Sequence, residues 1–151
     1  YFAGLARSKQ KAYGEAIPFL QKAVRLRSHK ASYHFYLGNA FRHLGSFDEA
    51  LQEFRRTLEI QPMHSQAQNN IGVIFWNLKA YERAEVEFNK ALDIQQNLPE
   101  IHQNLATLHL KNNRYANAIP HLDQVLKLQP GNTTAQKLLD HALGQMKKGP
   151  S

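Results

Sequence analysis

The sequence repeats with a period of 34 residues, and this period restricts the fold more than any other feature. Four stretches of 27 residues, starting at Phe2, Tyr36, Asn70 and Asn104, can be laid over one another without insertion or deletion. A fixed period of about 20 to 50 residues is typical of proteins in which one small structural unit stacks on its neighbour. The repeat therefore predicts an elongated array rather than one globular core.

Small and large residues recur at fixed columns of this repeat. A small residue that faces a large one allows two helices to approach closely. We therefore interpret Gly38 as a contact point, where close packing offsets the roughly 1 kcal/mol that glycine costs in a helix. The columns are Gly4, Gly38, Gly72 and Ala106; Ala16, Ala50, Ala84 and Ala118; and Leu20, Phe54, Phe88 and Leu122.

Each unit reads as two helices joined by a short turn. In the second unit, apolar residues fall on one helical face over 37–44 and on another over 50–58. Pro18 and Pro120 share a column near the predicted start of a second helix, where a missing amide hydrogen does least harm. An apolar stripe over 133–148 predicts a terminal capping helix. The predicted breaks between helices are Tyr13-Gly14, Gly45-Ser46, Lys79-Ala80 and Asn112-Asn113.

The period and these columns resemble the tetratricopeptide repeat family. The resemblance implies an all-α fold, a right-handed α-solenoid of stacked antiparallel helix pairs. We expect a single domain with a truncated repeat over 1–30, full repeats over 31–64, 65–98 and 99–132, and a capping helix over 133–148. Because the chain begins with Tyr1, we also expect it to be a piece of a longer chain. The residues that match the family pattern best are Leu37, Gly38, Phe41, Ala50, Phe54 and Pro62, whereas Gln96, Ala106 and His109 depart from it.

The net charge of +7 is concentrated at one end of the chain. Residues 1–30 carry +6, the next two repeats carry −1 each, and the rest is weakly positive. A basic chain can bind nucleic acid or an anionic membrane, but the nearly neutral middle gives no continuous basic track. Nucleic acid binding and direct membrane insertion are therefore not expected, and no apolar run approaches the ~20 residues that span a bilayer. The basic first unit could still contact an acidic partner.

No pattern in the sequence indicates catalysis, a metal or a cofactor. The eight histidines include no pair with the His-x-x-x-His spacing that places two zinc ligands on one helical face. The glycines follow the repeat rather than clustering into a phosphate-binding loop. The absence of cysteine excludes disulfides and thiolate chemistry. We therefore predict that this segment is not an enzyme, although the full-length chain could be.

The resemblance places a ligand groove on the first helix of each pair, which lines the concave surface in this family. With Leu37 toward the core, Asn39 lies about 200° around the helix and faces away from it. Carboxamides can pair with a peptide backbone, and exposed aromatic rings can anchor apolar side chains. The alternative is that these residues are ordinary polar helix surface and that Trp76 packs on a neighbouring turn. The predicted groove residues are Phe35, Tyr36, Asn39, Asn69, Asn70, Val73, Trp76, Asn77, Gln103, Asn104, Thr107 and Lys111.

Some members of the family resemble one another in a dicarboxylate clamp that binds chaperone tails. Asn39 and Asn70 have the clamp's 31-residue spacing. Phe35, Glu100 and Asn104 stand where the clamp has charged side chains, and Glu100 would repel a carboxylate. We therefore expect a different ligand, an extended or helical neutral peptide.

The predicted function is a non-catalytic scaffold that binds a protein or peptide partner in the concave groove. The alternative is a repeat appendage of a larger enzyme, for example a glycosyltransferase, that positions substrates or drives oligomerisation. Self-association through the truncated first repeat is also open, because its missing half would leave an apolar face uncovered. A cysteine-free chain suits the cytoplasm, and a membrane-anchored or exported parent chain remains an alternative.

Overall fold

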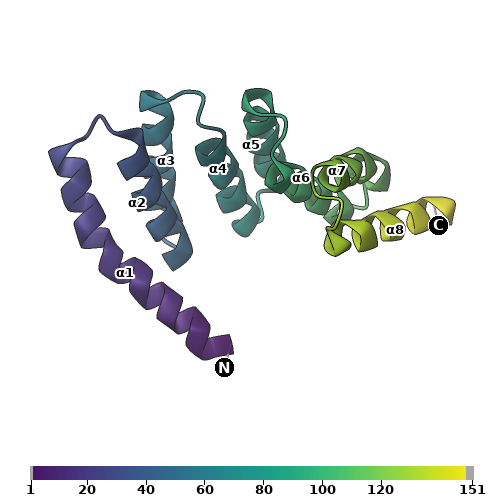
Figure 1. Cartoon of the computed structure of the whole chain (residues 1–151), viewed down its shortest axis with the longest axis horizontal. Helices are drawn as coiled ribbons and strands as arrows, with labels where there is room; N and C mark the ends of the chain where they lie inside the picture. The colour runs from purple at the N-terminus through teal and green to yellow at the C-terminus, as the bar shows by residue number, and fades with distance from the viewer. Residues whose placement is uncertain (1, 149–151) are drawn as a thin grey trace.

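The computed structural model describes residues 2–148, with side chains from Lys11 onward, and this part of the chain is entirely helical. The helices stack side by side into an elongated, curved array (Figure 1). This arrangement confirms the predicted all-α solenoid. The helices are α1 (Phe2–Leu26), α2 (Ala31–Leu44), α3 (Phe47–Ile60), α4 (Ser65–Asn77), α5 (Tyr81–Ile94), α6 (Pro99–Lys111), α7 (Tyr115–Leu128) and α8 (Thr133–Lys147).

The pairs α2–α3, α4–α5 and α6–α7 are joined by turns that share one backbone geometry. Gly45, Lys79 and Asn113 stand in the same repeat column and have φ values of 81°, 60° and 55°. This left-handed conformation suits glycine and asparagine, but it costs a lysine about 1–2 kcal/mol. The close packing of the two helices in each pair offsets that cost. The breaks predicted at Gly45-Ser46, Lys79-Ala80 and Asn112-Asn113 are therefore confirmed.

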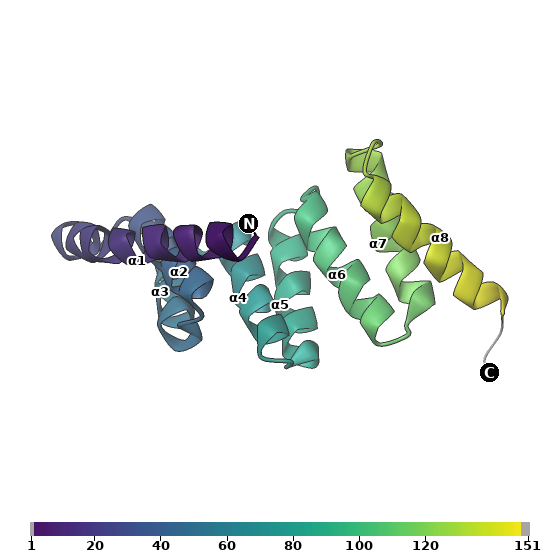
Figure 2. The same ribbon diagram turned by 90° about the horizontal axis from the view of Figure 1, so that it is seen from below.

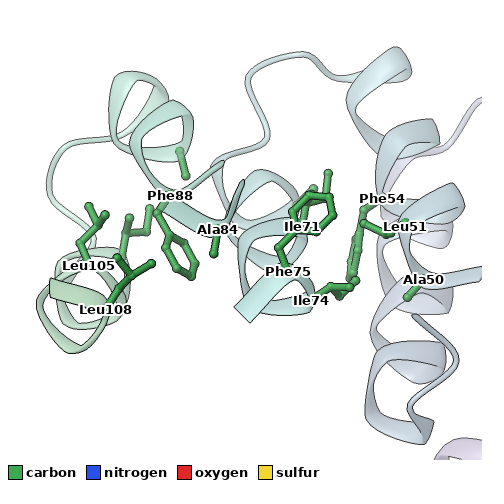
Figure 3. Close-up of a cluster of buried hydrophobic side chains, with 13 residues drawn as sticks. Ala50, Leu51, Phe54, Ile71, Ile74, Phe75, Ala84, Phe88, Leu105 and Leu108 are labelled. Atoms are coloured by element: carbon green, nitrogen blue, oxygen red, sulfur yellow. The ribbon is translucent and has the colours of Figure 1, made fainter. Parts of the chain in front are cut away.

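Small-to-large contacts hold each pair together. A Cβ atom added to Gly38 would lie 2.9 Å from Cε1 of Phe54, and one added to Gly72 would lie 2.6 Å from the Phe88 ring. Both rings are fully buried. In Figure 3, Phe54 lies between α3 and α4, and Phe88 points toward Leu105 and Leu108 of α6. Each phenylalanine therefore fills the space that glycine leaves and also reaches the next repeat.

The first unit differs from the prediction. The expected break at Tyr13-Gly14 is wrong, because α1 runs without interruption from Phe2 to Leu26. Lys11, which shares a column with the left-handed turn residues, is helical here. Pro18 consequently lies in the interior of the helix rather than near its start. A straight helix avoids the left-handed backbone that this repeat column would require of Lys11.

The last helix, α8, closes the other end of the array by packing on α7 (Figure 2). Ala135, Leu139 and Ala142 are buried in this contact together with Leu122 and Val125 of α7. Asn132 caps the helix by accepting a hydrogen bond from the amide of Ala135 at 2.9 Å. Within residues 2–148, no helix combines the length and apolar character that crossing a membrane requires.

The Gly72–Phe88 contact can be tested by exchanging it for the alanine–leucine pair found at 106 and 122. Gly72→Ala alone should lower the free energy of unfolding by about 1–3 kcal/mol, because the added methyl group overlaps the ring. Adding Phe88→Leu should recover part of that loss, so urea denaturation of both single variants and the double variant should show a positive coupling energy.

Gly14→Ala is the matched control, since no atom lies within 4 Å of the added Cβ. It should raise stability by up to about 1 kcal/mol through helix propensity alone. If Gly72→Ala also stabilises the chain, the close contact does not determine the helix spacing.

Candidate functional site

The first helices of the three pairs, α2, α4 and α6, lie side by side along the array. Hydrogen bonds between carboxamides join them: Asn70 of α4 donates to Oδ1 of Asn39 on α2 at 3.0 Å. Asn104 of α6 donates to Oδ1 of Asn69 on α4, also at 3.0 Å. These bonds form a ladder that crosses both boundaries between the full repeats.

The ladder leaves hydrogen-bonding capacity unused. Each carboxamide offers two N–H donors and one carbonyl acceptor. Within residues 11–148, Oδ1 of Asn70 and Oδ1 of Asn104 accept no hydrogen bond, and Nδ2 of Asn39 and of Asn69 donates none. Asn69 is buried, whereas the other three side chains are half-buried. The pairs therefore hold the amides in fixed orientations with acceptors and donors still available.

The aromatic residues predicted for the groove have different environments. Phe35 is half-buried and packs against Phe54, with the ring centroids 5.9 Å apart. Tyr36 is 57% exposed. Trp76, the single tryptophan, is half-buried and meets Tyr81 edge-on at 5.3 Å. Tyr36 thus presents most of its ring to solvent, whereas Phe35 and Trp76 both pack partly against the core.

A pocket of about 260 Å³ lies beside Trp76, between α4, α5 and α6. Phe88 forms part of its wall, so the same ring that fills the Gly72 contact also borders this pocket. The volume is smaller than the roughly 300–1,000 Å³ of a small-molecule or cofactor site. It suits a single apolar side chain. Its lining residues are Val73, Trp76, Phe88, Asn104 and Thr107, and all except Phe88 belong to the predicted groove set.

The other predicted groove residues occupy the ends and edges of the same helices. Asn77 and Thr107 are exposed and bond to backbone carbonyls of their own helices, at Val73 and Gln103. Gln103 is half-buried. The ammonium group of Lys111 lies 5.3 Å from the centre of the Tyr81 ring, a cation–π geometry.

Acidic residues are almost absent from these first helices. Nine of the twelve carboxylates of the chain lie on α3, α5 and α7, whereas α2 and α4 carry none and α6 carries only Glu100. Arg42 of α2 donates to Nε2 of His43 at 3.1 Å, and its own Nε is buried without a hydrogen bond. Burial lowers the pKa of Arg42. The first-helix surface is therefore weakly cationic.

A histidine cluster between α6 and α7 was not foreseen from the sequence. His102 donates from Nε2 to the carbonyl of Gln96 at 2.8 Å, so its Nδ1 accepts from Nδ1 of His121 at 3.0 Å. The ring of His109 stacks on that of His121 with centroids 5.6 Å apart. His102 and His121 are 19 residues apart, and the residues at the same two columns also bond in the other pairs, His34 to Glu53 and Gln68 to Glu87. This shared spacing is the sequence signal that could have predicted the cluster.

Two histidines of the cluster, His109 and His121, favour the neutral imidazole. Burial, together with the neighbouring His102 and His109 and against a smaller opposing effect of Glu85, lowers the pKa of His121 to about 4. Burial also lowers the pKa of His109. Arg114 holds both carboxylate oxygens of Glu85, at 3.2 and 2.6 Å. No group of three or more side chains in the described part of the chain is arranged to hold a metal ion.

A larger hollow of about 460 Å³ lies beside this cluster and includes Asp93, Gln96 and Gln124. His102 and His121 line it and bond to each other, and His102 also donates to the carbonyl of Gln96. The pocket at Trp76 is smaller, but its lining coincides with the predicted groove residues, so we take it as the candidate binding site.

This geometry, in which antiparallel helix pairs stack side by side into an array, defines the class of helical repeat proteins, the α-solenoids. Two models described as Tetratricopeptide repeat match the sequence, one over residues 1–62 and 37–99 and the other over 76–142. The chain belongs to the tetratricopeptide repeat family. Repeats of this family are in general non-catalytic modules of protein interaction. A comparison with curated proteins found no match.

Solved structures share the fold at low sequence identity. PilF of Pseudomonas aeruginosa is 21% identical with a TM-score of 0.81, covering 97% of this chain and 67% of its own. YrrB, described as a TPR protein with an unusual peptide-binding site, is 20% identical with a TM-score of 0.77, covering 84% of this chain and 66% of its own. The first TPR of Spaghetti (RPAP3), bound to the HSP90 peptide SRMEEVD, is 20% identical with a TM-score of 0.73, covering 78% and 96%.

The histidine cluster predicts a loss of stability in mild acid. The pKa of His121 is lower in the folded chain, about 4, than the ordinary value of 6.5, so the unfolded chain binds more protons between these values. The free energy of unfolding should therefore fall as the pH drops from about 6.5 toward 4, by on the order of 1 kcal/mol after solvent screening.

His121→Gln should reduce this acid sensitivity, because an amide can still donate to Nδ1 of His102 without gaining a charge. Urea denaturation at several pH values measures the effect. His29→Gln, which changes an exposed histidine, is the control. Equal pH dependence in His121→Gln and the unaltered chain would contradict the role assigned to the cluster.

Proposed function

We propose that this chain is a non-catalytic scaffold that binds an extended peptide segment of a partner protein along α2, α4 and α6. The observation that supports it most is the position of the pocket at Trp76 beside the amide ladder. The family resemblance and helical position together predict Val73, Trp76, Asn104 and Thr107 as groove residues, and all four line one pocket.

The chemistry of recognition follows from the two kinds of group. A peptide backbone unit offers one donor and one acceptor, which complement the unused Nδ2 and Oδ1 atoms of the ladder. The pocket would hold one large apolar side chain of the same peptide, and burying such a side chain contributes about 1.5–3 kcal/mol. The backbone bonds would thus give register, while the pocket would give specificity.

The charge distribution favours a neutral or mildly acidic peptide. Arg42 and Lys111 lie on helices with hardly any carboxylates, so an acidic segment would meet little repulsion. Both YrrB and the RPAP3 domain are described as peptide-binding, which supports the same use of the fold. The clamp expected for a chaperone tail is incomplete here, since Phe35 and Glu100 occupy two of its positions. An appendage of a larger enzyme would use the same surface, and that alternative stays a prediction.

Selection from a random-peptide display library tests this function. Enriched peptides should share one large apolar residue, and binding should change the fluorescence of Trp76, the only tryptophan. Asn70→Ala/Asn104→Ala should weaken binding roughly tenfold or more, because the variant loses two fixed amides, each worth about 0.5–1.5 kcal/mol. Fluorescence anisotropy with the selected peptides measures the affinities.

Val86→Ala, an exposed position on α5, is the control and should bind as the unaltered chain does. Circular dichroism should show that both variants keep their helicity. If the selected peptides bind the double asparagine variant as tightly as they bind the unaltered chain, the proposed groove is not the binding site.

A further inference from the structure

The face of α1 that corresponds to a helix–helix contact in every other pair is open. In the three complete pairs, the second helix meets the first through three columns whose side chains are all at most 1% exposed. The same columns in α1 hold Ala16, Leu20 and Ala23, which are only half-buried. The buried counterparts are Ala50, Phe54 and Thr57; Ala84, Phe88 and Ala91; and Ala118, Leu122 and Val125.

A fourth column makes this face more apolar than its counterparts. Phe19 is 77% exposed and shares a column with Glu53, Glu87 and His121. Those three side chains each bond to the first helix of their own pair. Phe19 therefore stands where the other repeats have a polar bond between helices, and it leaves a large ring in water. An exposed apolar face of this kind marks an interaction site.

The sequence contains a segment that fits this face. Residues 2–10 correspond by the repeat to 36–44, which are the last nine residues of α2. Gly4 falls in the column of Gly38 and Gly72, and Leu20 falls in the column of Phe54 and Phe88. The pairing of Gly4 with Leu20 would thus repeat the small-to-large contact that holds the complete pairs together.

In the straight helix, that segment does not reach the face of its own chain. Gly4 and Leu20 are sixteen residues apart on one uninterrupted helix, a separation of about 24 Å at 1.5 Å per residue. Folding back would require Lys11 to adopt the left-handed conformation of Gly45, Lys79 and Asn113. In Figure 1 the N-terminal half of α1 instead extends beyond the other helices.

We propose that α1 is a self-association surface that takes a second copy of this chain. Residues 2–10 of each copy pack on the Ala16, Phe19, Leu20 and Ala23 face of the other, in an antiparallel and reciprocal exchange. Such an exchange provides the helix contacts of a complete repeat without a left-handed Lys11, which makes it a low-cost route to a dimer. Because α1 carries Arg7, Lys9, Lys11, Lys22 and Arg25 against Glu15 alone, added salt should strengthen the dimer.

Thiol crosslinking tests the exchange, because the chain has no cysteine of its own. Gly4→Cys and Leu20→Cys variants are mixed and treated with a short bis-maleimide. A crosslinked dimer should form in the mixture and not in either variant alone. Gly4→Cys mixed with Val86→Cys, an exposed residue of α5, is the control and should give no dimer.

The double variant Gly4→Cys/Leu20→Cys distinguishes exchange from folding back. A dimer-sized product supports the proposal, whereas an intramolecular product of monomer size would show that the chain covers its own face and would overturn it. The absence of any product, with helicity intact, would also overturn it and leave the face to a different partner.

Sedimentation of the cysteine-free chain gives an independent measurement. Lys11→Gly lowers the cost of a left-handed turn and should weaken the dimer about tenfold, since it removes about 1–2 kcal/mol of strain from the folded-back monomer. Gly14→Ala stiffens the straight helix and should leave the dimer as strong or stronger. A monomer at every concentration, or no response to Lys11→Gly, would contradict the exchange.

Discussion

The structure depends on a glycine that faces a phenylalanine. At Gly38 and Gly72 the missing side chain is replaced by the ring of Phe54 or Phe88, so the two helices of a pair have one permitted spacing. In the third pair, alanine replaces the glycine at position 106 and leucine replaces the phenylalanine at position 122. The first residue is larger and the second smaller, so the two helices still pack closely. Because each ring also contacts the next repeat, the contact that closes a pair also sets the position of the following pair.

The sequence predicted the elements whose formation depends on the repeat itself. The three inner turns fall at one column because the helix pairs on either side pack closely enough to hold a left-handed residue, even when that residue is Lys79. At Lys11, which stands in the same column, the predicted turn does not form. Gly14 and Pro18 are weak helix residues and favoured a break there, but the straight helix avoids the left-handed backbone that a turn at Lys11 would require.

The candidate site could be predicted in part. The family resemblance pointed to the first helix of each pair, and a 100° rotation per residue then selected Val73, Trp76, Asn104 and Thr107 as side chains that leave the core. The pairing of Asn70 with Asn39, 31 residues away, and of Asn104 with Asn69, 35 residues away, could not be read in this way. This pairing depends on how far the first helix of one repeat is shifted along the first helix of the next. That shift is set by the packing between repeats and not by the position of a residue on its own helix. The contribution of Phe88 to the pocket was missed for the same reason.

Some columns of the repeat hold the same buried apolar residue in every complete pair, whereas the polar columns hold different residues. Ala50, Ala84 and Ala118 are the same residue in all three complete repeats and are completely buried, and adding atoms at such packed positions is destabilising. The polar column on the same faces varies freely from Glu53 to Glu87 to His121, and each variant finds a partner on the first helix. Nine of the twelve carboxylates lie on the second helices, so the first helices are left weakly cationic and amide-rich. The first-helix position of Asn39 holds Val73 and Thr107 in the next two units, so the polar surface of the first helices changes while the buried alanine column stays the same.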